Sequence, residues 1–215
     1  MSHTRILITK LPIVFVVCLT GCGSYSPLAK INFKLSQGFL PAHASNATIA
    51  KSQRLHKDKH GMPTYTNHAV RTRYVRATAY SHMENEPGAY GRMNASGGIL
   101  KYGKIRSAAA DWAVYPLGTT FKIKGLPHTY VVDDYGSALV GTNTVDIFKP
   151  SISKMKKWGT RYIEITVIQW GSYKRSLALL KGRKRYRHCY SMDMRCKHKI
   201  RNGVAIRELQ KHGAL

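Results

Sequence analysis

Acidic side chains are scarce in this sequence, which has 10 Asp and Glu against 35 Lys and Arg and a formal net charge of +25. Such a positive field favours polyanions of any kind as partners and carries no information about the fold. The scarcity also restricts acid–base chemistry to a few carboxyl groups. Seven of the ten acids lie between residues 73 and 172, so carboxylate chemistry is expected in that segment.

Long apolar runs are also lacking near the N-terminus. The run Leu11–Leu19 is shorter than the roughly 20 residues that a membrane-spanning helix needs. Arg5 and Lys10 precede it, and a positive segment followed by a short apolar one is typical of an export signal. We therefore interpret residues 1–21 as a signal peptide.

The apolar run ends in Leu19-Thr20-Gly21-Cys22, which resembles the lipobox of bacterial lipoproteins. The resemblance implies cleavage before Cys22 and lipidation of its thiol, which would anchor the protein to a membrane of the cell envelope. Gly23 follows, instead of the Asp associated with inner-membrane retention, which favours the outer membrane on its periplasmic side. The alternative is an ordinary secretory signal with an incidental cysteine.

Cysteine is equally rare, with four in the chain, and two of them lie in or next to the export signal. Cys189 and Cys196 remain as an even pair in an oxidising compartment, and we expect a disulfide between them. His188 and His198 flank the pair, so a Cys/His metal site is an alternative, although the spacing matches no common zinc pattern. Two free thiols are the third possibility. No metal or other cofactor is expected.

The chain after the signal divides into three parts by composition. Residues 22–72 are polar and rich in Ser, Ala, Asn, His and Lys, which predicts a flexible tether. Residues 73–172 carry short β-type runs separated by glycines. Residues 173–215 form a basic C-terminal extension, with 13 Lys and Arg against Asp193 and Glu208.

The basic extension contains the run Lys181–Arg187, which in a cytosolic protein would suggest nucleic acid. The export signal argues against nucleic acid and favours anionic polymers or lipids of the envelope. The alternative is a solvated charge run without a partner. A short helix over Val204–Lys211 could dock back on the folded domain.

Residues 73–172 carry the fold signal. Alternating apolar residues in Thr119–Lys124 and Tyr162–Val167 predict strands with one buried face, and the apolar runs Tyr130–Val132 and Thr144–Phe148 predict buried strands. Pro150–Trp158 is predicted to be a helix, with a glycine directly after it. About 100 residues of short strands with one or two short helices indicate a mainly β, compact barrel.

Four motifs in this segment resemble the 3D domain, a family named for its three aspartates. They stand in order as Ala77-Thr78-Ala79-Tyr80, Ala109-Ala110-Asp111-Trp112-Ala113-Val114-Tyr115-Pro116-Leu117-Gly118-Thr119, Val132-Asp133-Asp134-Tyr135-Gly136-Ser137-Ala138-Leu139-Val140-Gly141 and Val145-Asp146-Ile147-Phe148. The resemblance implies a six-stranded double-psi β-barrel related to the MltA and RlpA-like barrels. The RlpA-like branch has a histidine where Asp111 stands, so this chain matches the MltA side.

Relatives of these groups include lytic transglycosylases, which cleave the MurNAc–GlcNAc bond of peptidoglycan and leave a 1,6-anhydro end. By motif position the three aspartates are Asp111, Asp134 and Asp146. A glycosidic bond needs an acid that is protonated near neutrality, which calls for burial or a neighbouring carboxylate. Asp146 lies inside an apolar run, so we predict that it is the acid, with Asp134 orienting it and Asp111 completing the cluster.

Each of these assignments has a structural alternative. Asp111 could be purely structural. Asp133 neighbours Asp134 on a strand and points to the opposite face, where a solvated surface charge is expected. Tyr80 and Trp112 could stack on sugar rings as substrate-binding residues, or they could belong to the core.

Two functions therefore remain open. The presence of an aspartate at all three motif positions favours a peptidoglycan lytic transglycosylase that acts on glycan strands. The alternative is a non-catalytic peptidoglycan-binding lipoprotein, since a fold does not fix an activity.

Overall fold

In the computed structural model of the protein, the described residues belong to one compact unit. The structure describes residues 40–84 and 91–211, with side chains up to residue 203. The predicted signal peptide, the lipidation site Cys22 and the first part of the predicted tether lie outside the described residues. Over the described ranges, no helix has both the length and the apolar character to cross a membrane.

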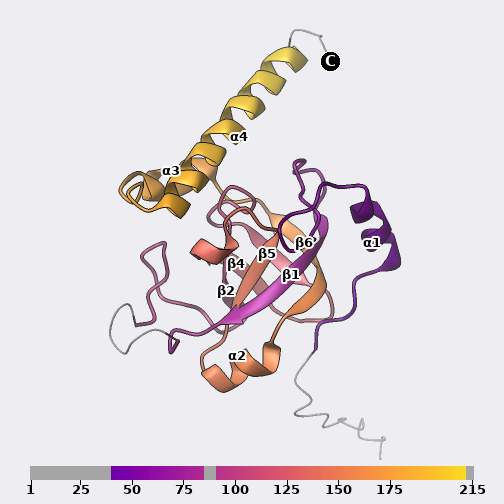
Figure 1. Cartoon of the computed structure of the whole chain (residues 1–215), viewed down its shortest axis with the longest axis vertical. Helices are drawn as coiled ribbons and strands as arrows, with labels where there is room; N and C mark the ends of the chain where they lie inside the picture. Colours follow the sequence, from indigo (N-terminus) through magenta and orange to yellow (C-terminus); the bar gives the residue numbers. More distant parts are fainter. Residues whose placement is uncertain (1–39, 85–90, 212–215) are drawn as a thin grey trace, which may run out of the picture. The chain divides into compact units, whose positions relative to one another are not determined.

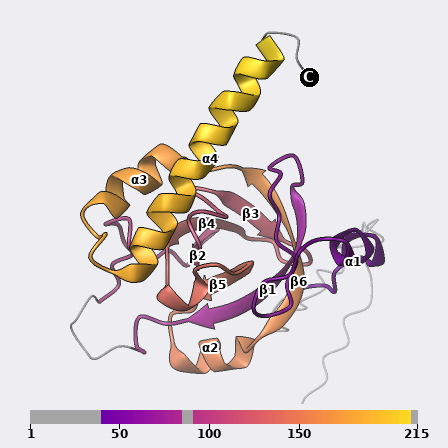
Figure 2. The same ribbon diagram turned by 45° about the horizontal axis from the view of Figure 1, so that its top comes forward.

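Six strands form a mixed sheet that closes into a barrel in the order β1-β5-β2-β4-β3-β6. The pairs β1·β5 and β2·β4 are parallel and the other four pairs are antiparallel. Figure 2 shows the strands around a common centre, with α3 and α4 on one side and α2 on the other. The bounds are β1 (Thr72–Tyr80), β2 (Ile105–Ala110), β3 (Thr120–Ile123), β4 (Thr129–Asp134), β5 (Thr144–Phe148) and β6 (Arg161–Gln169).

The strands follow the sequence pattern where one face is buried. In β1 and β3 buried and less buried residues alternate, and β5 is almost wholly buried. All four predicted strands are confirmed, and so is the mainly β class. Strands β1 and β2 were not predicted. The buried face of β1 begins with the charged Arg73, which breaks the apolar alternation, and the Ser-Ala-Ala-Ala end of β2 is buried throughout and shows no alternation.

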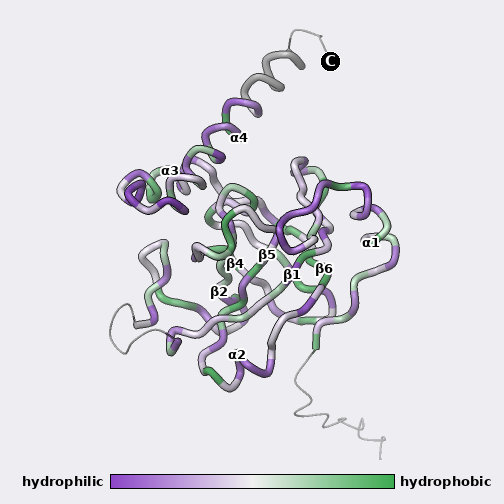
Figure 3. The backbone as a smooth tube through the Cα atoms, in the orientation of Figure 1, coloured by the Kyte–Doolittle hydropathy of each residue, from purple (hydrophilic) through white to green (hydrophobic). Residues whose placement is uncertain are grey.

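The helices lie outside the barrel: α1 (Asn46–Gln53), η1 (Ser137–Leu139), α2 (Ile152–Trp158), α3 (Tyr173–Lys181) and α4 (Arg187–Lys211) (Figure 1). The predicted helix before Gly159 is confirmed as α2, although it begins after Ser151, whose hydroxyl accepts from the backbone N–H of Lys154. In Figure 3 hydrophobic residues follow β4 and β5, whereas hydrophilic residues dominate around α3.

The predicted tether is wrong for residues 40–72, which pack on the barrel. The Ala42 N–H donates to the Lys124 carbonyl at 2.9 Å, and a Cβ on Gly125 would lie 2.5 Å from the Ala42 nitrogen. Further along, the Asp58 carboxylate accepts from the backbone N–H of Asn143 at 2.6 Å. Composition misled here, because this segment is held by polar contacts to the barrel more than by an apolar face.

The predicted disulfide is also wrong, because Cys189 and Cys196 are both free and buried in α4. Seven residues of helix separate their Cα atoms by about 10 Å, beyond the roughly 7 Å that a disulfide can bridge. The Cys189 thiol faces the Tyr135 hydroxyl at 3.3 Å, and the Cys196 thiol faces the Trp112 carbonyl at 3.5 Å. The two cysteines therefore act as small core residues that seat α4 on the barrel.

We expect both thiols to remain reduced and unreactive while the protein is folded. Burial raises the pKa of Cys196 to about 12, so its reactive thiolate is absent at neutral pH. Mass spectrometry after iodoacetamide treatment of residues 23–215 without reductant should show no alkylation in buffer and two adducts in denaturant. If the denatured protein takes no label until reductant is added, the two cysteines form a disulfide and the free thiols are contradicted.

Candidate functional site

Two of the three motif aspartates are brought together by the pairing of three adjacent strands. Ala109 in β2 pairs with Asp146 of β5 on one side and with Asp134 of β4 on the other. Asp146 also pairs with Thr78 of β1. Neighbouring strands lie about 5 Å apart, so the two aspartates flank a position where Ala109 contributes only a methyl group.

A cleft of about 860 Å³ opens over this position. It is lined by the ends of β1 and β4, by the middle of β5, by residues 91–100 and by the connection between α3 and α4. Its polar lining residues are Tyr80, Ser81, His82, Glu84, Asn94, Asp134, Tyr135, Asp146, Arg183, Arg185, Tyr186 and His188. The cleft thus combines carboxylates with basic and aromatic side chains.

Asp146 has the environment of a proton donor. Burial raises its pKa to about 6, and the negative charges of Glu84 and Asp134 act in the same direction. The Thr78 hydroxyl donates to Asp146 Oδ1 at 2.7 Å, which opposes the shift and fixes the orientation of the carboxyl group. Near neutrality Asp146 therefore exchanges between its acid and carboxylate forms.

Asp134 is held more rigidly. Its Oδ1 accepts from the backbone N–H groups of Tyr135 at 2.9 Å and Ala95 at 3.1 Å, and its Oδ2 accepts from the Tyr80 hydroxyl at 3.1 Å. Burial raises the pKa of Asp134, while these three hydrogen bonds lower it. Burial and the nearby Asp134 raise the pKa of Tyr80 strongly, so Tyr80 stays a neutral donor in the cleft.

Asp111 does not lie in the cleft, which corrects its predicted place in the cluster. Its side chain is fully buried, its Oδ2 lies 2.7 Å from Arg195 Nη2 in an ion pair, and the same oxygen accepts from the Gly141 N–H at 2.7 Å. Its Oδ1 accepts from the Ala113 N–H at 2.8 Å. These contacts join the loop after β2 to the η1–β5 loop and to α4, which is a structural role.

Trp112 is likewise unavailable to a sugar, because it is fully buried in the core. Its indole N–H donates to the Asp134 carbonyl at 2.9 Å, and its ring meets Tyr135 edge-on. The predicted sugar-stacking role of Trp112 is wrong, and its position indicates that it supports the backbone beneath Asp134. Tyr80, in contrast, lines the cleft.

Asp133 points away from Asp134, as the strand period predicts, but it is not a solvated charge. Only 4% of the residue is exposed, and its Oδ2 accepts from Lys101 and from the Ser107 hydroxyl, both at 2.8 Å. The expectation failed because the opposite face of β4 is covered by the segment before β2.

The C-terminal extension contributes the basic side of the cleft, which the sequence did not predict. Arg183, Arg185 and His188 line it, and the Arg183 guanidinium donates to the Ala95 carbonyl at 2.8 Å. A usable signal was present, since Cys189, Met192 and Cys196 repeat at helical spacing and are all buried against the barrel. That spacing indicates a docked helix instead of a free basic arm.

Within the part of the chain that the structure describes, no three His, Cys, Asp or Glu residues converge as metal ligands would. The cleft instead offers one carboxyl group that titrates near neutrality, a second carboxylate fixed by three donors, and two guanidinium groups. This combination can donate a proton, accept it back and hold a negatively charged ligand.

Residues 106–169 match the family model described as the 3D domain. The matched segment runs from β2 to β6 and so includes Asp111, Asp134 and Asp146. No curated protein sequence matches the chain.

Proposed function

We propose that this protein is a peptidoglycan lytic transglycosylase, or a closely related glycan-cleaving protein, whose acid–base residue is Asp146. The match of residues 106–169 to the 3D domain supports a role on peptidoglycan. The single observation that carries the proposal is a carboxyl group with a pKa raised to about 6 at the base of an open cleft. A glycosidase acid needs this protonation behaviour.

The proposed reaction uses one carboxyl group twice. Asp146 donates its proton to the O4 leaving group of GlcNAc as the bond from that oxygen to C1 of MurNAc breaks. The 6-hydroxyl of MurNAc then bonds to C1 and returns its proton to the Asp146 carboxylate. No water is consumed, and the product is a 1,6-anhydro end.

The other cleft residues have supporting roles in this proposal. Asp134, fixed by three donors, would stabilise the positive charge that develops at C1. Arg183 and Arg185 would bind carboxylates of the glycan strand or its stem peptides, which suits guanidinium forks. Tyr80 would position Asp134 and contact the sugar face.

The finer fold and the location are part of the same proposal. A barrel with two parallel and four antiparallel pairs fits the crossed connections of a double-psi barrel. The lipobox-like Leu19–Cys22 supports export and a lipid anchor at Cys22 in the outer membrane, facing the periplasm. The strongly positive charge suits the anionic polymers of that compartment.

The rate of glycan release is expected to fall as the pH rises through about 6, because only protonated Asp146 can donate. Replacing Glu84 with Gln removes a negative charge that helps to raise this pKa, so the fall should move to lower pH. The measurement is the initial rate of muropeptide release from purified sacculi between pH 4 and pH 8, about two pH units on either side of the Asp146 value. If Glu84→Gln leaves the pH dependence of the rate unchanged, Asp146 is not the titrating acid.

A further inference from the structure

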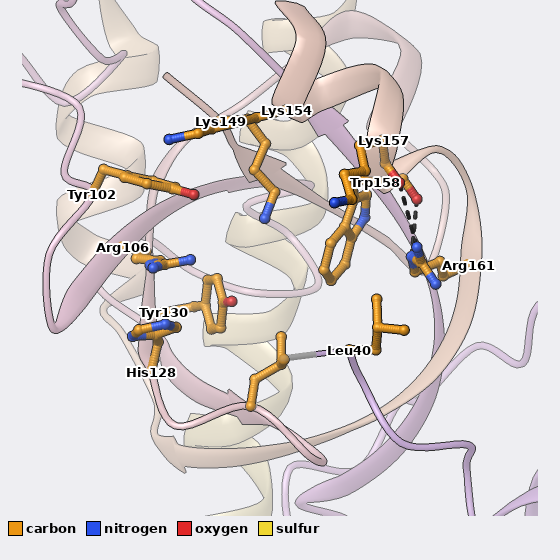
Figure 4. A pocket seen from close by; sticks show the side chains of 11 residues that line it. Leu40, Tyr102, Arg106, His128, Tyr130, Lys149, Lys154, Lys157, Trp158 and Arg161 are labelled. Atoms are coloured by element: carbon orange, nitrogen blue, oxygen red, sulfur yellow. Dashed lines mark hydrogen bonds between the residues drawn. The ribbon is translucent and has the colours of Figure 1, made fainter. Parts of the chain in front are cut away.

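A second cavity of about 330 Å³ lies beside α2 and shares no lining residue with the cleft. It is formed by the starts of β2, β4 and β6, by α2 and by Leu40 and Leu126. Figure 4 shows its charged side chains surrounding the aromatic rings of Tyr130 and Trp158. The glycan-cleaving proposal gives this cavity no role.

The charge of the cavity is one-sided. Five cations line it, and no Asp or Glu does. None of the five has an ion-pair partner among residues 40–84 and 91–203. The cations are Arg106, Lys149, Lys154, Lys157 and Arg161.

Two further donors in the cavity lack partners. The Tyr130 hydroxyl and the Trp158 indole N–H are buried, and neither donates to an acceptor in the described part of the chain. Tyr130 is fully buried, and Trp158 is 7% exposed. Figure 4 shows the Tyr130 hydroxyl directed into the space between the side chains. Buried donors without acceptors are costly, and an acceptor-rich ligand would satisfy them.

Lys149 is the most enclosed of the five cations. The residue is 7% exposed, and its ammonium group lies 4.3 Å from the centre of the Trp158 ring. Burial lowers the pKa of Lys149 to about 8, with Arg106, Arg161 and Lys154 acting in the same direction. A bound anion would relieve this mutual repulsion.

We propose that this cavity is a binding site for a phosphate group carried by a molecule with an apolar or aromatic portion. A single carboxylate offers one negative charge and two oxygens. A phosphate monoester carries about two charges and three acceptor oxygens, which suits several cations and the unpartnered N–H and O–H donors better. The apolar portion would rest against Leu40, Leu126 and the Trp158 ring, which line the same cavity.

The test measures by calorimetry the binding of phenyl phosphate to residues 23–215. Acetate serves as the carboxylate probe. Lys149→Gln removes the enclosed charge and Trp158→Phe removes the indole donor. Lys156→Gln is the matched control, since Lys156 is exposed on the same helix and does not line the cavity. We expect Lys149→Gln to weaken phenyl phosphate binding about tenfold or more, Trp158→Phe to weaken it less, and Lys156→Gln and Asp146→Asn to leave it unchanged.

The source of the phosphate is identified by sedimentation with phosphatidic acid vesicles, which present a phosphate monoester, against phosphatidylcholine vesicles. Sedimentation that Lys149→Gln abolishes and Lys156→Gln does not assigns a lipid headgroup. Phenyl phosphate binding without any Lys149-dependent sedimentation assigns a free phosphorylated compound. The proposal is overturned if the wild type does not bind phenyl phosphate, if acetate binds equally well, or if the Lys149 and Lys156 variants weaken binding alike. If Asp146→Asn still binds phenyl phosphate, binding in this cavity does not depend on glycan cleavage, and the two proposals are tested separately.

Discussion

Replacing Asp146 with Asn is expected to lower the rate of 1,6-anhydro muropeptide release by about 100- to 10,000-fold, the usual contribution of a general acid–base group. The amide has nearly the size and shape of the carboxyl group and can still accept from the Thr78 hydroxyl, which lies 2.7 Å from the carboxylate. It cannot donate a proton to the leaving oxygen or take one from the 6-hydroxyl. The rate is measured by chromatography of soluble muropeptides from purified sacculi.

Binding to the sacculus provides the control for this variant. Asp146→Asn should still pellet with peptidoglycan, because the Arg183 and Arg185 side of the cleft is unchanged. Ser81→Ala, a neutral change at the cleft wall, should keep most of the activity. Full activity in Asp146→Asn would show that another group supplies the proton.

Replacing Asp111 with Ala is expected to lower the free energy of unfolding by about 3 kcal/mol, the lower end of the range for breaking a buried ion pair. The lower end applies because Asp111 is fully buried while the side chain of Arg195 is 37% exposed. The loss also leaves the Gly141 and Ala113 N–H groups without their acceptor. The change in the free energy of unfolding is measured by urea denaturation, monitored by tryptophan fluorescence.

A double-mutant cycle with Arg195→Ala separates the ion pair from the two backbone contacts. Arg195→Ala alone should cost less than Asp111→Ala, because it removes one of three contacts to Asp111. A stable Asp111→Ala protein that has lost glycan cleavage would place Asp111 in the chemistry and contradict its structural role.

The fold was predictable where a strand has one buried face or is wholly buried and flanked by turns. The pattern at Thr119–Lys124 and Tyr162–Val167 located β3 and β6, and the run Thr144–Phe148 gave β5 residue for residue. It failed at β1, where the charged Arg73 occupies the buried face, and at β2, where small buried alanines show no alternation. It also failed at residues 40–72, because polar contacts such as Asp58 to Asn143 have no periodic signature.

The site was predictable in its centre and not at its rim. Asp134, Asp146 and Tyr80 line the cleft as predicted from the motifs, because motif order fixes their strands. Asp111 belongs to the same motif set and is buried by α4, which the motif does not contain. The arginines of the α3–α4 connection reach the cleft only through tertiary packing that local sequence does not specify.

The most direct test of the central claim is the identity of the products that residues 23–215 release from purified sacculi, determined by mass spectrometry. These residues include every residue that the structure describes. We predict 1,6-anhydro muropeptides from the wild type and none from Asp146→Asn. Reducing-end muropeptides would contradict the 6-hydroxyl step and indicate a hydrolase. Absence of any product, with the protein still bound to the sacculus, would contradict the enzyme and indicate a peptidoglycan-binding protein.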